Sequence, residues 1–351
     1  MRTHSPCLIV PLLALALANT VGCGEELTPK TKLKSPRILA VQADPVNPGV
    51  GESSTFTPLV YLPPGETAAY SWSWCPVPTN PDDGYLCPLD QAGLDALTAA
   101  LGLAGVPPLD LGTDSTAVFT NPFPTALAAA VCANDPAVLQ VLYGVAAAAG
   151  SGATPGLFEC GLATMPVQIK LVLLGATDID VGVFSLNVPI DDTTPRNLNP
   201  VVRGLWDMTT PPGVRVDDVG SVIVPIGAEV EVAVDMDETV SETILDRITL
   251  PDGEYQRDAA GNLVLGPSRE RITVSWFKER GGLDKGSTGF NIKARDAQGN
   301  PIPFDVARKN TWTAPEEAAA VGTTARLIAV VRDGRGGVAW TSGVFGLGVA
   351  R

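Results

Sequence analysis

Short runs in which apolar and polar residues alternate constrain this chain most, because a period of two residues fits a β-strand and does not fit a helix. In the run YSWSW at residues 70–74, the three aromatic residues share one face and the two serines share the other. The run ITVSW at residues 272–276 repeats the pattern with Ile, Val and Trp on one face. We interpret both runs as strands that cross the core of a β-sandwich.

A closing hairpin follows each Trp-bearing strand, within residues 169–186 and again within residues 327–347. The two Trp strands are about 200 residues apart but the two hairpins only about 160, so the sequence predicts a repeat with about 40 extra residues inserted in its first copy. We predict two domains, at residues 36–190 and 201–351, joined by the linker DDTTPRNLNP at residues 191–200. The 36 glycines and 31 prolines are typical of strands joined by turns.

Residues 76–160 interrupt the strand rhythm and predict helices. Asp90 is placed to cap a helix in which Leu94, Leu97 and Leu101 form one apolar stripe, and Asp135 followed by proline is a second helix start. We expect a further short helix near residues 125–133 and interpret the whole block as a helical insertion in an all-β domain.

The first 22 residues have the composition of an export signal. Arg2 gives a positive start, residues 8–18 form an apolar run of signal-peptide length, and small residues precede Cys23. The end of this segment, Val21-Gly22-Cys23, resembles a bacterial lipobox, although Thr20 stands where Leu is usual. The resemblance implies cleavage before Cys23 and attachment of a lipid to its thiol.

A lipidated Cys23 would place residues 23–35 as a polar tether to the membrane. Gly24 follows the cysteine instead of Asp, and by family analogy this favours transport to the outer membrane of a Gram-negative cell. The alternative is cleavage by the ordinary signal peptidase after the A-L-A at residues 16–18, which would give a secreted protein.

An even number of cysteines follows Cys23, and in an exported chain this predicts two disulfides. The four residues are Cys75, Cys87, Cys132 and Cys160. A local pairing (75–87 with 132–160) and a nested pairing (75–160 with 87–132) both suit an insertion held at its base. Sequence alone leaves this choice open.

The core Trp on a middle strand, the short alternating strands and the closing hairpin are similar to immunoglobulin-type and PKD-type sandwiches. The run VVRDGRGG at residues 330–337 is similar to the last hairpin of PKD-like and cadherin-like bacterial surface modules. Over residues 36–351 the chain resembles tandem-sandwich lipoproteins of Gram-negative bacteria. It departs from them in lacking the WxFGDG signature and the cysteine pair on facing strands. The resemblance implies a mainly β fold of two immunoglobulin-like β-sandwich domains, the first with a helical, disulfide-stapled insertion.

Several kinds of chemistry are excluded by what the chain lacks. Its only histidine is His4, which is lost with the signal, so nucleophilic triads and the usual zinc hydrolase sites have no imidazole. No C-x-x-C occurs for redox chemistry. The net charge of −14 opposes binding to nucleic acid and to anionic lipid headgroups. We therefore predict no catalysis, no cofactor and no nucleic-acid partner.

Calcium needs only oxygen ligands, and two D-x-D pairs are weak candidates for it. Asp178 and Asp180 lie in a predicted hairpin turn, and Asp235 and Asp237 at a predicted strand end. Alternate residues of a strand share a face, so each pair is able to aim two carboxylates at one ion. Ordinary acidic turns are the simpler interpretation.

The hypothesis that these observations favour is a non-catalytic, membrane-anchored surface lipoprotein with a structural or binding role. The alternatives are a carbohydrate-binding or carbohydrate-active exported protein and a calcium-dependent adhesin. Exposed aromatic residues would serve the first alternative, and Trp312, in a loop-like sequence, is the best such candidate. A protein or glycan partner would bind the loops or the helical insertion.

Overall fold

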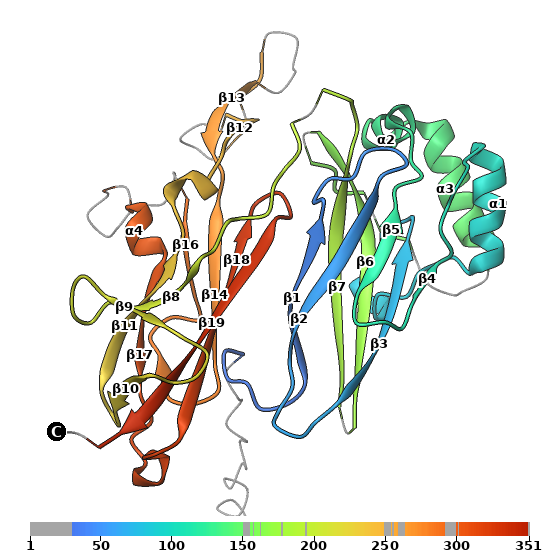
Figure 1. Ribbon diagram of the computed structural model, residues 1–351. Helices are drawn as coiled ribbons and strands as arrows, with labels where there is room; N and C mark the ends of the chain where they lie inside the picture. The colour runs from blue at the N-terminus through green and yellow to red at the C-terminus, as the bar shows by residue number, and fades with distance from the viewer. Residues whose placement is uncertain are drawn as a thin grey trace, which may run out of the picture.

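The computed structural model describes residues 30–149, 155–156, 158–161, 163–176, 178–193, 195–248, 254, 256–258, 264–291, 300 and 302–349. The predicted signal, Cys23 and the start of the predicted tether lie outside the described residues. The fold is mainly β, with sheets of sandwich type (Figure 1).

The first sandwich contains β1 (Arg37–Asp44), β2 (Ser53–Tyr61), β3 (Ala68–Cys75), β4 (Asp110–Gly112), β5 (Ala117–Thr120), β6 (Thr164–Gly175) and β7 (Ile179–Pro189). One sheet has the order β1-β2-β5 and the other β4-β3-β6-β7, and all neighbours are antiparallel. Trp72 and Trp74 of β3 are 0 % and 2 % exposed. The ring of Trp74 lies edge-on to Phe119 of the facing sheet, with centroids 4.9 Å apart. The predicted Trp strand is therefore the centre of this core.

The second sandwich contains β8 (Gly204–Asp207), β9 (Val214–Val216), β10 (Val222–Pro225), β11 (Glu229–Asp235), β14 (Ile272–Lys278), β15 (Gly282–Leu283), β16 (Ser287–Phe290), β17 (Lys309–Thr313), β18 (Thr324–Asp333) and β19 (Val338–Gly348). Its sheets have the orders β10-β19-β18-β14-β16 and β15-β17-β11-β8-β9. Trp276 of β14 is 1 % exposed between them, as the alternation predicts. A separate hairpin of β12 (Thr243–Arg247) and β13 (Leu265–Arg269) projects from one end (Figure 1).

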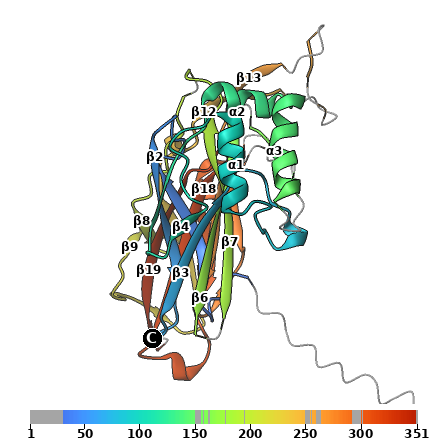
Figure 2. The ribbon, with the colours of Figure 1, turned by 90° about the vertical axis from the view of Figure 1, so that its right-hand side faces the viewer.

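Four α-helices complete the described secondary structure, together with short 3₁₀ turns. The α-helices are α1 (Gln91–Leu101), α2 (Thr125–Cys132), α3 (Pro136–Ala148) and α4 (Phe304–Ala307), and the 3₁₀ turns are Pro81–Asp83, Glu238–Val240 and Ala318–Ala320. Helices α1, α2 and α3 gather beside one end of the first sandwich (Figure 2). They lie at the end opposite to residues 30–36, where the described chain begins (Figure 1).

The two sandwiches pack against each other through the inter-sandwich cluster, whose buried members are Leu33, Leu39, Ala40, Tyr61, Ile328, Val330 and Val338. Hydrogen bonds surround this apolar contact: Arg332 donates to the carbonyl of Leu39 (2.6 Å) and Gln42 to the carbonyl of Val338 (2.6 Å). Asn199 of the linker bonds both sides, donating to the carbonyl of Ala43 and accepting from the amide of Val338. The linker is thus part of the packed structure.

The predicted organisation differs from the structure in three places. The block at residues 76–160 is only partly helical, because it contains β4 and β5, which complete both sheets of the first sandwich. Four-residue β5 is too short to reveal its period. The second sandwich begins with β8, a strand that the alternation does not predict, and its strand β10 pairs in parallel with β19. Residues 31–33, predicted as tether, pack against β14, with Leu33 only 3 % exposed.

Candidate functional sites

The helical block, defined as residues 76–160 without β4 and β5, is held at both ends by disulfides. Cys75 at the end of β3 pairs with Cys87, and Cys132 at the end of α2 pairs with Cys160. The local pairing is therefore the one present, and the nested alternative is not. Each bridge closes a short segment on itself, so the block is fixed where it leaves and rejoins the sandwich.

Side-chain caps start the helices where the sequence predicts them. Asp90 accepts a hydrogen bond from the amide of Gly93 (2.8 Å), and Asp135 accepts one from the amide of Ala137 (2.8 Å). Leu97 and Leu142 are 1 % and 3 % exposed in the same core as the Trp strand. The buried face of the block thus belongs to the sandwich, and its outer face is a surface that a partner is able to reach.

The outer face has an unusual charge, because residues 38–169 contain no lysine and no arginine. Its ionised side chains are all acidic.

Among the described residues, no single helix has the length and apolar composition of a membrane span; α2 and α3 pass that test only as a pair bent by 91°.

The first pair of calcium candidates has structural roles. Asp180 accepts a hydrogen bond from the amide of Ile38 (2.7 Å) and so joins β7 to the start of β1. The backbone carbonyl of Asp178 accepts from the amide of Gly175 in the β6–β7 turn. The structure does not bring these two carboxylates to a common ligand among the described residues.

The second pair, Asp235 at the end of β11 and Asp237 just beyond it, is bound by an arginine. Arg203 donates to Asp235 (3.0 Å) and to both carboxylate oxygens of Asp237 (2.7 and 2.9 Å). The hydrogen bond from Arg203 lowers the pKa of Asp237 below its ordinary value. A cation would have to displace this guanidinium. Within the described ranges, no group of three or more His, Cys, Asp or Glu residues is arranged to hold a metal.

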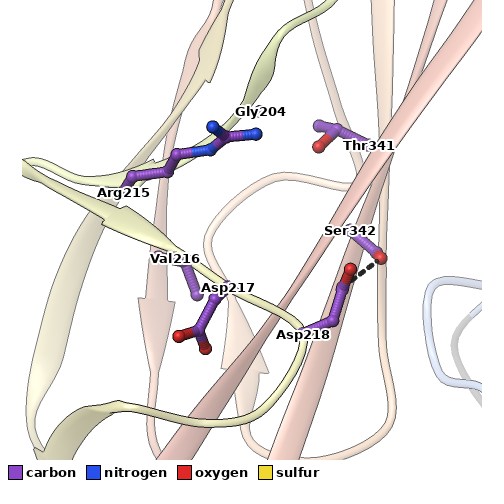
Figure 3. Close-up of a pocket in the computed structure, with 7 residues that line it drawn as sticks. All are labelled: Gly204, Arg215, Val216, Asp217, Asp218, Thr341 and Ser342. Carbon is purple, nitrogen blue, oxygen red and sulfur yellow. Dashed lines mark hydrogen bonds between the residues drawn. The ribbon is translucent and has the colours of Figure 1, made fainter.

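A polar pocket of about 370 Å³ opens between the β9 region and β19 (Figure 3). Its lining consists of Gly204, Arg215, Val216, Asp217, Asp218, Thr341 and Ser342. Asp218 accepts from the hydroxyl of Ser342 (2.9 Å), as Figure 3 shows, and Arg215 donates to the carbonyl of Arg203 (3.0 Å).

The remaining acid of the pocket also has internal partners. Asp217 accepts from Ser221 and from the amides of the turn that follows it, and these bonds lower its pKa. The lining thus satisfies its own charges and contains no histidine or cysteine. It offers hydrogen bonds to a polar ligand, and the base beside its Ser342 hydroxyl is the carboxylate of Asp218 rather than an imidazole.

One buried acid was not predicted from the sequence. Glu270 is 1 % exposed and accepts from Arg335 (2.7 Å), which also forms an ion pair with Glu242. Burial raises the pKa of Glu270, and the bond from Arg335 opposes that rise. Its second oxygen, Oε2, has no hydrogen-bond partner among the described residues. Arg335 stands in the glycine-rich turn of the closing hairpin, so this cluster fastens that turn to the base of β12 and β13.

Trp312 is a core residue, and its prediction as part of a loop is wrong. It lies in β17, is 0 % exposed and stacks on Phe345 with ring centroids 4.9 Å apart. Its indole N–H donates to the carbonyl of Arg280 (3.0 Å). The strand Lys309–Thr313 lies between Pro303 and Pro315, and this proline-flanked setting made the run resemble a loop. It gives no exposed platform for a sugar.

The fold and these sites define a mostly β chain of sandwich-type sheets with two disulfides. No family model matches the chain, and no curated protein matches it. A solved structure similar to it contains three N-terminal domains of the Highly Immunogenic Outer Capsid protein (Hoc) of bacteriophage RB49. The identity is 10 %, the TM-score is 0.18, and the match covers 90 % of this chain and 71 % of that one. A TM-score this low carries no argument about function.

Proposed function

We propose that the protein is an exported lipoprotein, anchored through Cys23, with a structural or binding role and no catalytic activity. The observation that carries the proposal is the pairing of all four downstream cysteines into two disulfides. Disulfides form and persist in oxidising compartments outside the cytoplasm. The same pairing uses all four cysteines that follow Cys23 in the sequence, which suits a Cys23 thiol that carries a lipid.

The two sandwiches are, in this proposal, immunoglobulin-like domains. In support, each has a buried Trp on the strand that precedes its closing hairpin in the sheet, as β3 does beside β6 and β14 beside β18. Strand β10 runs parallel to the last strand β19, whereas the other neighbours are antiparallel. Domains of this type hold their loops on rigid sheets, which suits binding rather than chemistry.

The proposed absence of catalysis is supported by the position of the histidine in the sequence and by the hydrogen-bond partners of four aspartates. The only histidine, His4, lies in the predicted signal. Asp217, Asp218, Asp235 and Asp237 are bound to neighbouring residues. Carboxylates used this way stabilise turns and strand ends, which suits a structural role for them better than general acid or base catalysis. The binding role falls most naturally on the helical block, which lies at the end opposite to the start of the described chain (Figure 1).

Metabolic labelling with a fatty-acid probe tests the anchor. The wild-type protein is expected to carry the label in the membrane fraction, and Cys23→Ala is expected to lose both label and membrane association. Cys7→Ala is the matched control, since Cys7 lies in the predicted signal and its replacement should leave labelling intact. An unlabelled wild-type protein released to the medium would overturn the anchor in favour of secretion.

The non-catalytic role is tested separately with the purified chain. Binding on a glycan or protein array without turnover of any polysaccharide would agree with it. Release of reducing sugar from a polysaccharide would overturn it and favour the carbohydrate-active alternative.

A further inference from the structure

Lys278 is a largely buried lysine without a carboxylate partner, and its ammonium is not among the fully enclosed, unbonded side-chain atoms of the described residues. It ends strand β14, is 8 % exposed, and lies on the same face of the strand as Trp276 and Val274. None of the ion pairs among the described residues involves it, and its side chain donates no hydrogen bond to them. A lysine this deeply buried is normally paired, because removing its charge from water is costly.

The neighbour of Lys278 is another lysine. Residues 31–33 run beside the end of β14: the amide of Leu33 donates to the carbonyl of Lys278 and the amide of Lys278 donates to the carbonyl of Thr31, both at 2.8 Å. This makes Lys32 the parallel bridge partner of Lys278. Burial lowers the pKa of Lys278, and the positive charge of Lys32 lowers it further. No acid contributes in the opposite direction.

Packing fixes the lysines around this pair. Leu33 is buried in the inter-sandwich cluster, so the segment cannot swing away, while Lys30 and Lys34 on either side are exposed. Arg37 donates to the carbonyl of Lys30 (2.5 Å) and adds a fourth cation to residues 30–37, which contain no acid. The nearest acid in sequence, Glu279, accepts a hydrogen bond from the amide of Arg326.

We propose that Lys32 and Lys278, flanked by Lys30 and Lys34, bind the phosphate of an anionic lipid headgroup in the membrane that carries the lipid of Cys23. The four residues are called the basal lysines below. The proposal rests on the proposed anchor, which would turn the basal lysines toward the membrane. It also rests on the lysines themselves, whose positive charge attracts phosphate. Phosphate supplies the negative charge and the several acceptor oxygens that two adjacent ammonium groups lack.

The length of the segment between Cys23 and the basal lysines agrees with a lipid headgroup as the ligand. The eight peptide units from Cys23 to Thr31 span at most about 28 Å. The basal lysines therefore stay close to any membrane in which Cys23 is anchored. The charge of the rest of the molecule favours the same orientation, because residues 38–169 contain no cation and would be repelled by an anionic surface. The net negative charge of the chain thus coexists with a local basic site at its membrane end.

Vesicle flotation of the mature chain carrying Cys23→Ala tests the proposal without the lipid anchor. At about 50 mM salt we expect binding to vesicles that contain phosphatidylglycerol and none to pure phosphatidylcholine, with a loss of binding as salt rises. Each lysine near an anionic surface contributes about fivefold in affinity, so Lys32→Gln with Lys278→Gln should weaken binding about 25-fold. Lys32→Gln with Lys34→Gln avoids the buried position and should weaken it similarly.

The matched control is Lys170→Gln with Lys285→Gln, which removes the same charge from two other lysines. Retained binding in this control supports the site, and an equal loss in both double variants overturns it in favour of nonspecific charge. Inorganic phosphate at millimolar concentration distinguishes a lipid headgroup from free phosphate as the ligand. If phosphate protects Lys278 from an acylating reagent while the protein does not bind vesicles, a lipid occupant is overturned. Failure of Cys23 labelling with intact vesicle binding would overturn the anchor and leave the site standing.

Discussion

The two sandwiches of this protein share a plan but stabilise themselves differently. Both disulfides lie in the first sandwich and its helical block. Of the ten ion pairs found among the described residues, nine lie wholly within the second sandwich, and the tenth joins Arg196 of the linker to Glu52. The first sandwich thus uses covalent bonds where the second uses charge.

The cause is visible in the sequence. Residues 38–169 contain no lysine or arginine, so their carboxylates can pair only with cations from outside this stretch, as Glu52 does with Arg196. Exposed ion pairs contribute little and are screened by salt, whereas a disulfide restricts the unfolded chain under all salt conditions. The first sandwich has only Arg37 and Lys170 as cations in its strands, so a helical block added to it depends on its cysteines. The comparison teaches that charge composition decides which kind of bond is available.

The largest effect is expected from removing both disulfides. With sequence separations of 12 and 28 residues, the bridges should each contribute about 3 kcal/mol, or about 6 kcal/mol together. The variant with serine at Cys75, Cys87, Cys132 and Cys160 should lose hydrogen-exchange protection in α1, α2, α3 and β3. Protection of β14 and β18 should fall much less. Equal loss in both sandwiches would show that the inter-sandwich cluster couples them into one cooperative unit.

The next effect concerns the cores, where the two sandwiches should behave alike. Trp74→Ala and Trp312→Ala each remove a fully buried aromatic ring and should each cost about 4 kcal/mol of unfolding free energy. Chemical denaturation followed by hydrogen exchange in each sandwich measures both. Trp340, which is only partly buried beside the inter-sandwich cluster, provides the control and should cost less. A cost below about 1 kcal/mol for Trp312→Ala would contradict its place in the core.

The sequence predicted what depends on local periodicity. The Trp strands, the closing hairpins and the capped starts of α1 and α3 follow from local residue patterns, and the existence of two disulfides follows from the even count of cysteines after Cys23. The choice of disulfide pairing does not, because it depends on which segments fold back together. The structure selects the local pairing.

Features that depend on distant partners were missed. The ion-pair cluster of Glu270 joins residues 65 positions apart, and nothing near Glu270 in sequence indicates that it is buried. The site of Lys278 is similar, because its neighbour Lys32 comes from the opposite end of the chain. Asp235 and Asp237 were correctly placed at a strand end, but Arg203, which binds them, precedes β8 and gave no local signal.

Arg335→Ala tests whether any ion pair of the second sandwich approaches a disulfide in strength. It leaves Glu270 buried without its partner, and removing one member of a buried pair costs about 3 kcal/mol. Because burial already raises the pKa of Glu270, the native state takes up its proton more readily than the unfolded state. Its contribution is present below the ordinary glutamate pKa and is lost as pH rises through the raised value.

The cost of Arg335→Ala should therefore be larger at pH 8 than at pH 5. Thermal melts of wild type and variant across that range measure it. Arg335→Ala with Glu270→Gln is the control and should remove the pH dependence, because no buried carboxylate remains to titrate. A cost that does not change with pH would show that Glu270 is not the group responsible.

The smallest effect is expected from Asp237→Asn, which breaks one arm of the exposed Arg203 cluster. Arg203 lowers the pKa of Asp237, so the contribution is present above the ordinary aspartate pKa and is lost as pH falls through the lowered value. The difference in melting temperature between wild type and variant should be small at pH 7, shrink in 1 M salt and vanish in acid. Asp246→Asn, on the projecting hairpin, is a control of equal charge.

The same melts sharpen the comparison of the two sandwiches. If Arg203 occupies both carboxylates as the geometry indicates, calcium and a chelator should leave the melting temperature of the wild type unchanged. A rise with calcium that Asp237→Asn abolishes would mean that the ion displaces Arg203, and the second sandwich would then gain from a metal what the first gains from its disulfides. Only that result would restore Asp235 and Asp237 as a cation site. The other D-x-D pair is a weaker candidate, because Asp180 already accepts a hydrogen bond from the amide of Ile38.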